Sequence, residues 1–140
     1  RFSSVEVGRG RSNQHEINGN SAIREVLGPE KLYLKEVPVR ICRLGSDRTT
    51  TSDITWYDAR EKSSDRTEWR LYYQKDLWAF ENDLMVIIRD NQNDEAALQL
   101  MVVAEGDPME DTIINICPVT GVLPGKAVSL QTDISLFNLI

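Results

Sequence analysis

The sequence predicts a mainly β domain with two short helices, and three observations support this fold class. Apolar and polar residues alternate with a period of two in several short segments, as expected for strands with one buried face. The same segments are rich in β-branched and aromatic residues, which favour strands. Only two short segments carry a helical pattern. About seven strands in a chain of this length predict one barrel-like domain over residues 1–140, with an open side.

The strand pattern occurs six times along the chain, and residues 2–7 are a further candidate strand. The alternation is clearest where Trp69, Leu71 and Tyr73 share one face. Two other segments are almost wholly apolar and therefore predict strands that are buried on both faces. In chain order, the predicted strands are 37–44, 52–57, 66–73, 84–89, 97–104 and 129–136.

Two segments predict short helices with recognisable ends. Residues 21–27 place apolar side chains on one face, with Asn20 or Ser21 as the N-cap and Gly28 followed by a proline as the stop signal. In the second segment, 107–116, Asp107 caps the helix and a proline occupies the first helical position. Glu110 stands where a capping-box acid belongs. The remaining polar or glycine-rich stretches, 8–20, 58–65 and 118–126, predict loops.

The basic residues lie almost entirely in the first half of the chain. Residues 1–75 hold 14 of the 16 Lys and Arg together with 11 acids, so their net charge is +3. Residues 76–140 hold two basic residues and 11 acids, so their net charge is −9. This asymmetry suggests one face that binds a polyanion and an acidic back that is turned away from it.

Composition excludes several classes of protein. No apolar run approaches the roughly 18 residues of a membrane span, and no signal peptide opens the chain. Because the chain begins at Arg1 rather than Met, we expect a fragment of a longer protein. Cys42 and Cys117 are interpreted as buried free thiols rather than a disulfide. Together with the single His15 they do not form the four-ligand pattern of a structural zinc site.

Residues 8–20, called the N-arm here, are the first candidate for chemistry. They read GRGRSNQHEINGN. Arg9 and Arg11 offer charge for phosphates or paired hydrogen bonds to guanine, while Asn13 and Gln14 have the side chains that pair with adenine edges. Nearby glycines allow the backbone to approach a ligand closely. The alternative is a flexible, solvated arm.

Residues 58–70, called the C-arm here, are the second candidate. Four basic residues alternate with four acids in the sequence DAREKSSDRTEWR. A mixed-sign segment of this kind is most often a solvated surface. It also suits base reading, because an acid accepts a hydrogen bond from the cytosine amino group while an arginine reads guanine. Acids further orient arginine side chains through paired hydrogen bonds.

An enzymatic reading has less support in the sequence. The acidic residues of the second half offer metal ligands, so a divergent metal-dependent nuclease remains an alternative. A nuclease of the PD-(D/E)xK type needs a Glu-x-Lys or Asp-x-Lys triplet, which this chain lacks, and the arginine in Glu68-Trp69-Arg70 does not release a proton. We therefore expect a solvated acidic back, formed by Asp90, Asp94, Glu95, Glu105, Asp107, Glu110 and Asp111.

Several segments resemble a known family. The helix segment NSAIREVL at residues 20–27, the aromatic segment ITWY at 54–57 and the segment RTEW at 66–69 are similar in order and character to the N-terminal effector domain of EcoRII-type (type IIE) restriction endonucleases. The apolar-to-acidic pattern over 100–114 is similar as well. The likeness covers nearly the whole chain. It implies a B3-like DNA-binding pseudobarrel of about seven strands and two short helices.

The resemblance implies that this domain binds double-stranded DNA without cutting it. Both arms would enter the major groove at a short, nearly palindromic site, CCWGG. The implied partner is a nuclease domain C-terminal to this one in the same bacterial, cytoplasmic restriction enzyme, and only that domain would use Mg²⁺. DNA binding needs no cofactor, and a monomer is expected. The predicted DNA-binding residues are Arg9, Arg11, Ser12, Asn13, Gln14, His15, Asn18, Arg60, Lys62, Ser64, Asp65, Arg66, Glu68 and Arg70.

A third alternative is a protein-interaction module whose arms bind a partner chain. It needs no base-reading residues, so a lack of any affinity for DNA at low salt would favour it. The sequence therefore leaves three hypotheses: a DNA-binding effector domain, a metal-dependent nuclease and a protein-binding module.

Overall fold

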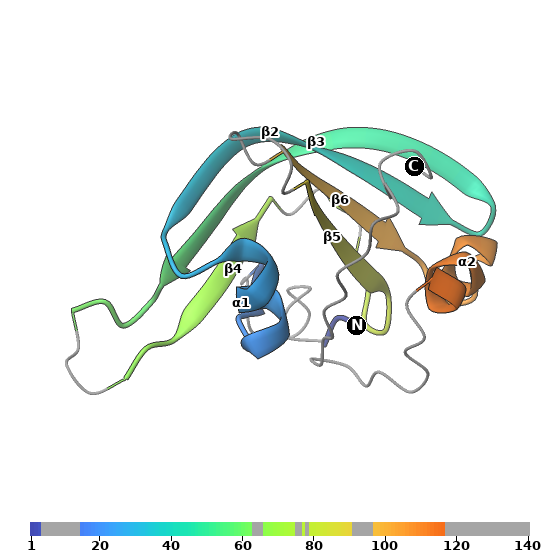
Figure 1. The fold of residues 1–140 in the computed structure, drawn as a ribbon. Helices are drawn as coiled ribbons and strands as arrows, with labels where there is room; N and C mark the ends of the chain where they lie inside the picture. Colours follow the sequence, from blue (N-terminus) through green and yellow to red (C-terminus); the bar gives the residue numbers. More distant parts are fainter. Residues whose placement is uncertain (4–14, 63–65, 75–76, 78, 91–96, 117–140) are drawn as a thin grey trace.

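The computed structural model describes residues 1–3, 15–62, 66–74, 77, 79–90 and 97–116. Within them, six strands form one mixed sheet that curls into a half-barrel, and two short helices accompany it (Figure 1). The mainly β class with two short helices is thereby confirmed. The elements are β1 (Glu16–Asn18), α1 (Ser21–Leu27), β2 (Leu32–Arg43), β3 (Ser46–Asp58), β4 (Trp69–Tyr73), β5 (Leu84–Asp90), β6 (Ala97–Val103) and α2 (Pro108–Ile116).

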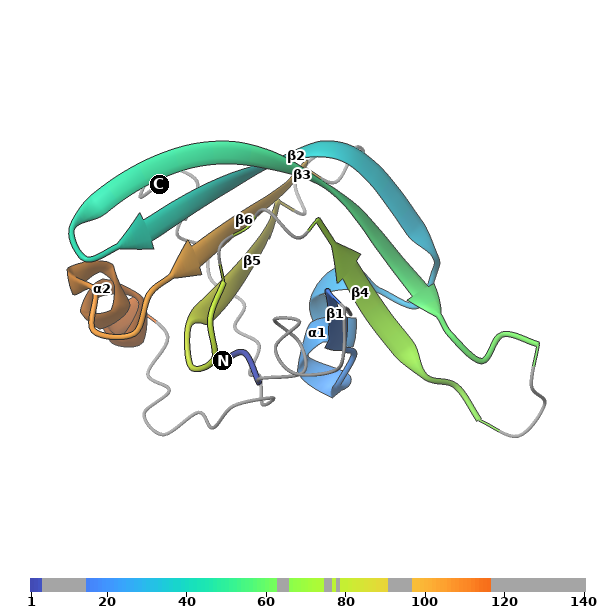
Figure 2. The same ribbon diagram turned by 180° about the vertical axis from the view of Figure 1, so that it is seen from behind.

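The sheet runs in the order β1-β4-β3-β2-β6-β5. All neighbours are antiparallel except β2 and β6, which are parallel with Val39 opposite Leu100. The long β2–β3 hairpin forms the arch of the half-barrel, with α1 below one end and α2 at the other (Figures 1 and 2). The register shifts between Leu34 and Val37, where Glu36 has φ 53° and donates its N–H to Asp53. Such a bulge bends the strand, which suits a curled sheet.

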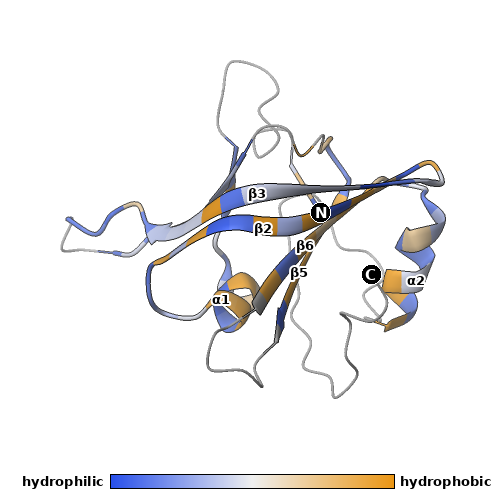
Figure 3. Ribbon diagram, turned by 90° about the horizontal axis from the view of Figure 1, so that it is seen from above, coloured by the Kyte–Doolittle hydropathy of each residue, from blue (hydrophilic) through white to orange (hydrophobic). Residues whose placement is uncertain are grey.

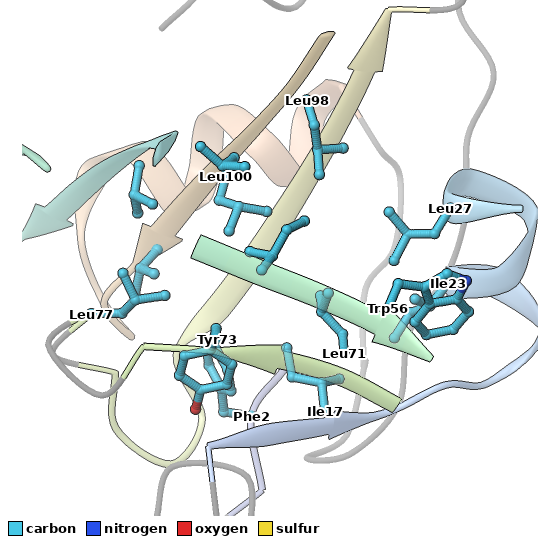
Figure 4. Close-up of a cluster of buried hydrophobic side chains, with 14 of the residues drawn as sticks. Phe2, Ile17, Ile23, Leu27, Trp56, Leu71, Tyr73, Leu77, Leu98 and Leu100 are labelled. Atoms are coloured by element: carbon cyan, nitrogen blue, oxygen red, sulfur yellow. The ribbon is translucent and has the colours of Figure 1, made fainter. Parts of the chain in front are cut away.

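The hydrophobic core fills the concave side of the sheet. Side chains of β1, β2, β3, β4 and β6 meet those of α1 there (Figure 4). Trp56 is fully buried next to Ile23 and Leu27 of α1, and its Nε1 donates to the carbonyl oxygen of Gly28 at 3.0 Å. Hydrophobic and hydrophilic residues alternate along β2, as Figure 3 shows. The alternation predicted for β2 and β4 is therefore confirmed in the core. β6 is buried on both faces, as predicted, whereas β5, at the edge of the sheet, is mostly half-buried.

Both helices have the predicted bounds and caps. The Asn20 side chain accepts the N–H of Ile23, and Gly28 ends α1 with φ 90°. Arg89 adds a contact that the sequence did not suggest, because its Nη1 donates to the carbonyl oxygens of Val26 and Leu27, both at 2.9 Å. These are carbonyls at the helix C-terminus, where a cation is favourable.

At α2, Asp107 caps the helix by accepting the N–H of Met109. Glu110 contributes as a capping-box acid would, but its carboxylate reaches the N–H of Gly106, one residue before the cap. A second, smaller cluster forms on the outer face of the sheet, where α2 packs through Met109 and Ile113 on apolar side chains of β2 and β6. No helix in the described part of the chain is long and apolar enough to cross a membrane.

Several predicted boundaries differ from the structure. β2 and β3 begin earlier than expected and form a longer hairpin. β3 begins at Ser46 because a tight turn at Leu44 and Gly45 (φ 54° and 79°) lets the ladder continue through polar residues, and β2 begins at Leu32 because pairing continues beyond the bulge, from Leu34 to Leu32. β4 begins only at Trp69, and residues 66–68 are not strand. Part of the predicted loop 8–20 is the strand β1. The predicted strand 129–136, residues 4–7 of the candidate 2–7 and the loop 118–126 lie outside the described residues.

Cys42 is a free, buried cysteine, as predicted. Its burial raises the pKa of the thiol. The second cysteine, Cys117, lies outside the described residues.

Candidate nucleic-acid interface

The structure describes half of the predicted DNA-binding residues. Those described are His15, Asn18, Arg60, Lys62, Arg66, Glu68 and Arg70. Those outside the described residues are Arg9, Arg11, Ser12, Asn13, Gln14, Ser64 and Asp65. The candidate interface is therefore built from the end of the N-arm and from most of the C-arm.

The two arms meet because β1, at the end of the N-arm, pairs with β4, at the end of the C-arm. Asn18 lies opposite Arg70 in this antiparallel ladder. The ladder is extended at one end by the carbonyl oxygen of His15, which accepts the N–H of Tyr73 at 3.0 Å. The His15 ring lies edge-on to the ring of Tyr73, with centroids 5.9 Å apart. The ends of the N-arm and the C-arm, which are far apart in the sequence, are thus neighbouring strands of the sheet.

Gly19 closes the other end of this junction. Its N–H donates to the carbonyl oxygen of Trp69 at 2.7 Å. Trp69 stacks on Trp56 with centroids 5.1 Å apart, and a Cβ on Gly19 would stand 2.5 Å from Cη2 of Trp56. A glycine is required here for close approach, because any side chain would collide with the stacked indoles.

The C-arm leaves the sheet on a narrow, hydrogen-bonded stem. One carboxylate oxygen of Asp58 accepts the N–H groups of Arg60 at 2.9 Å and Glu68 at 2.8 Å. The N–H of Ala59 donates to the carbonyl oxygen of Glu68 at 2.8 Å. Beyond this stem, the connection between β3 and β4 extends away from the sheet (Figure 1). One oxygen of Asp58 therefore supports the stem.

A continuous set of ion pairs and hydrogen bonds, called the arm network here, runs from β1 to the C-arm. The Glu16 carboxylate accepts Tyr57 Oη at 2.8 Å and Arg70 Nη1 at 3.0 Å. The other terminal nitrogen of Arg70, Nη2, donates to Glu68 Oε1 at 2.6 Å. Glu68 Oε2 then accepts Arg60 Nε at 2.5 Å. The arm network consists of Tyr57, Glu16, Arg70, Glu68 and Arg60.

The electrostatics of the arm network favour the ionised forms of its acids and bases. Hydrogen bonds from Arg60 and Arg70 lower the pKa of Glu68 to about 2. The hydrogen bonds that Arg70 donates to Glu68 and Glu16 raise the pKa of Arg70. Burial, together with the hydrogen bond to Glu16, raises the pKa of Tyr57 to about 12. At neutral pH the phenol is therefore a neutral donor between charged groups.

The cations of the C-arm differ in how far their donors are used. Both terminal nitrogens of Arg70 are engaged, and its buried Nε has no hydrogen-bond partner among the described residues. Arg60 uses only Nε toward Glu68, so its two terminal nitrogens make no bond within the described residues. Lys62 and Arg66 are exposed and form no ion pair there. Arg60, Lys62 and Arg66 can thus bind an added anion or base edge.

The acidic residues that were expected to form a solvated back are only partly exposed among the described residues. Asp107 and Glu110 are buried, and both accept backbone N–H groups around α2. Glu105 and Asp111 are exposed, as predicted, whereas Asp94 and Glu95 lie outside the described residues. Among the residues that the structure describes, no group of three or more His, Cys, Asp or Glu side chains could hold a metal ion.

Sequence reasoning missed two members of the site, Glu16 and Tyr57. Glu16 was treated as part of a loop, and Tyr57 as part of an aromatic strand. Only the pairing of β1 with β4 and of β4 with β3 places both side chains beside Arg70. A weak signal was available, because Glu16 and Ile17 already carry the polar–apolar alternation of a strand.

No protein-family model, characterised protein or solved structure matches this chain. The resemblance to restriction-enzyme effector domains therefore stays a prediction from the sequence.

Proposed function

We propose that this domain binds double-stranded DNA sequence-specifically through its N-arm and C-arm, as a non-catalytic, B3-like effector domain of a restriction endonuclease. The observation that carries the proposal is the C-arm itself. It extends from the sheet on a hydrogen-bonded stem and presents Lys62, Arg66 and the terminal nitrogens of Arg60. Positive side chains on a projecting hairpin suit a major groove, which admits a two-stranded ribbon.

In this proposal, some C-arm residues contact DNA and others support the arm. Lys62 is a point charge for phosphate, whereas Arg60 and Arg66 offer the paired donors that match guanine. Arg70 and Glu68 have their charged groups engaged with each other and support the arm instead. The site preference implied by the resemblance, CCWGG, remains part of the proposal.

The test measures binding of the whole chain to a labelled CCWGG duplex and to a scrambled duplex, without metal, over a series of salt concentrations. We expect affinity for both duplexes to fall steeply as salt rises, because binding releases counterions from DNA.

Arg66→Ala should weaken binding to CCWGG about tenfold and reduce the preference over the scrambled duplex. Lys62→Ala should weaken binding to both duplexes equally. Lys35→Ala, an exposed cation on β2, is the matched control.

The proposal fails if the wild-type chain binds neither duplex at low salt, or if Arg66→Ala and Lys35→Ala behave alike. Metal-dependent cutting of plasmid DNA by the chain would instead support the nuclease alternative.

One observation favours a protein-binding module as the second candidate function. Tyr33 and Tyr72 are 59% and 44% exposed on the outer face of the sheet. Both lie opposite Thr55, which stands between them on β3, so they form one row across three strands. Exposed tyrosines are common in protein interfaces. If this face binds a partner, Tyr33→Ser should abolish that binding without changing affinity for DNA.

A further inference from the structure

The arm network contains a residue at its N-arm end whose position suggests a role in reading DNA. Glu16 is the first residue of β1, where the N-arm joins the sheet, and its side chain is only 16% exposed. Within the described residues, its carboxylate accepts hydrogen bonds from Tyr57 and Arg70, which both lie on strands of the sheet. It is linked to the projecting part of the C-arm through Arg70 and Glu68.

Three steps connect Glu16 to Arg60. Glu16 fixes one terminal nitrogen of Arg70 at 3.0 Å, and the planar guanidinium thereby fixes the other. That second nitrogen holds Glu68 Oε1 at 2.6 Å. Since a carboxylate is planar too, its Oε2 is set in place to accept Arg60 Nε at 2.5 Å.

The last member of this series has the donors that base reading requires. Arg60 is held at Nε and by its backbone N–H, which donates to Asp58. The two terminal nitrogens, which form the pair that matches the two acceptors of guanine, are not used within the described residues. An arginine fixed in this way loses less side-chain entropy on binding than a free one.

We propose that Glu16 is a positioning residue that sets the orientation of Arg60 through Arg70 and Glu68, so that the N-terminal strand controls the sequence preference of the C-arm. This inference rests on the proposed function. It differs from a purely structural role, which would weaken binding to every sequence equally.

The first measurement needs no DNA. Exchange of the Arg60 Nε–H with water, followed by ¹⁵N NMR of the whole chain, should be slow in the wild type because this hydrogen is bonded to Glu68. Glu16→Gln should speed it about tenfold, since removing one charge weakens a network whose members strengthen one another. Glu30→Gln, which removes an exposed acid before β2, is the matched control and should leave exchange unchanged. Unchanged exchange in Glu16→Gln would overturn the inference.

The second measurement uses the two duplexes. Glu16→Gln should lower the ratio of affinities for CCWGG and scrambled duplex about tenfold, and Arg60→Ala should lower it by a similar factor. In the double variant this ratio should be no lower than in Arg60→Ala alone, because both changes remove the same contact with DNA. Additive losses, or an equal loss on both duplexes, would contradict the inference.

The two measurements separate the possible failures. If the wild type binds no DNA, the proposed function fails, and the Nε–H exchange still decides whether Glu16 orients Arg60. If Glu16→Gln unfolds the chain, Tyr57→Phe provides a milder variant, because it removes one hydrogen bond to Glu16 while keeping the charge. Faster exchange of the Arg60 Nε–H in Tyr57→Phe supports the inference, and wild-type exchange contradicts it.

Discussion

At the α2 end of the sheet, buried carboxylates accept hydrogen bonds mainly from backbone N–H groups, whereas at the arm end the more exposed carboxylates of Glu16 and Glu68 accept mainly from arginine side chains. Asp83 is 2% exposed and accepts the N–H groups of Phe80 and Glu105 as well as Arg43 Nη2. Asp107 accepts the N–H groups of Gly45 and Met109. These carboxylates join turns, strand ends and a helix start that are distant in sequence.

The arm end has more exposed ion pairs. The Glu68 side chain is 34% exposed and that of Arg60 is 41% exposed. Ion pairs of this kind add little to stability, because water solvates both charges in the unfolded and the folded chain. A buried carboxylate that loses its partners costs much more. We infer that the carboxylates at the α2 end stabilise the fold, whereas those at the arm end orient arginine side chains.

Glu110 and Arg1 extend the α2 end to the start of the chain. Burial of the Glu110 carboxyl acts to raise its pKa, but hydrogen bonds from Arg1 and the Gly106 N–H outweigh it and the pKa is lowered. Next to Arg1, Phe2 is buried against Tyr73 and exchanges backbone hydrogen bonds with Asn82 and Asp83. The first residues are thereby held at the α2 end, while β1 belongs to the arm end.

The largest expected effect comes from replacing Asp83 by asparagine. The amide has the shape of the carboxylate, but its NH₂ group would replace one acceptor oxygen and face either the N–H of Glu105 or both Arg43 and the N–H of Phe80. Leaving buried donors unsatisfied, together with loss of the buried charge pair, should lower the free energy of unfolding by about 3 kcal/mol. Urea denaturation followed by tryptophan fluorescence measures this loss.

Glu81→Gln is the control for Asp83→Asn. It removes the same charge two residues away from an exposed side chain, so stability should change by less than about 0.5 kcal/mol. Equal losses in both variants would show that net charge, and not the hydrogen bonds of Asp83, stabilises the α2 end.

A smaller effect is expected at the arm end from Gly19→Ala. The new Cβ would stand 2.5 Å from Trp56 and 2.7 Å from the Trp69 carbonyl oxygen, so the stacked indoles or the backbone must move. Such overpacking should destabilise the fold by about 2 kcal/mol. It should also weaken DNA binding, because β1 carries Glu16. Thermal unfolding and duplex binding are measured on the same variant.

Gly45→Ala separates packing from backbone conformation. Nothing lies within 4 Å of a Cβ at Gly45, but its φ of 79° disfavours a side chain. We expect a loss of about 1 kcal/mol from the left-handed backbone alone. DNA binding should stay unchanged, since this turn is at the α2 end. A Gly19→Ala protein as stable as wild type would contradict the close approach at the junction.

Local signals were sufficient to predict much of the fold. The capping residues Asn20 and Asp107 and the stop at Gly28 fixed both helices, because each depends on neighbours within four residues. Alternation fixed the buried faces of β2 and β4. The lengths of β2 and β3 were underestimated, since the start of β3 is polar and the bulge between Leu34 and Val37 interrupts the start of β2. Strand pairing through such segments is not visible in either strand alone.

The candidate site was harder to predict, because it depends on contacts between distant residues. The interaction of Glu16 with Arg70 spans 54 positions, and that of Arg43 with Asp83 spans 40. The sequence shows that acids alternate with arginines in the C-arm, but it does not show which pairs form. It therefore could not separate Arg70, whose terminal nitrogens are engaged, from Arg60, whose terminal nitrogens make no bond within the described residues.

The smallest effect is a titration that tests the orientation role of Glu68. A carboxyl whose pKa is about 2, against an ordinary 4.5, stays ionised as pH falls from neutral, and its ion pairs are lost only when pH falls through about 2. Carboxyl ¹³C NMR of Glu68 should therefore show a midpoint near pH 2. Arg60→Ala should raise that midpoint toward the ordinary value, because it removes the hydrogen bond that lowers the pKa most. Lys62→Ala should leave the midpoint in place, since Lys62 forms no ion pair with the described residues.

A midpoint near 4.5 in the wild type would mean that Arg60 and Arg70 do not hold Glu68 in solution. The stability lost on acidification should remain small even where the midpoint is low, because Glu68 is partly exposed and water competes for its charge. The titration would then report an ion pair that orients side chains without adding much to the free energy of unfolding. That combination is what distinguishes the arm end from the α2 end, where removing a carboxylate should unfold the chain more readily.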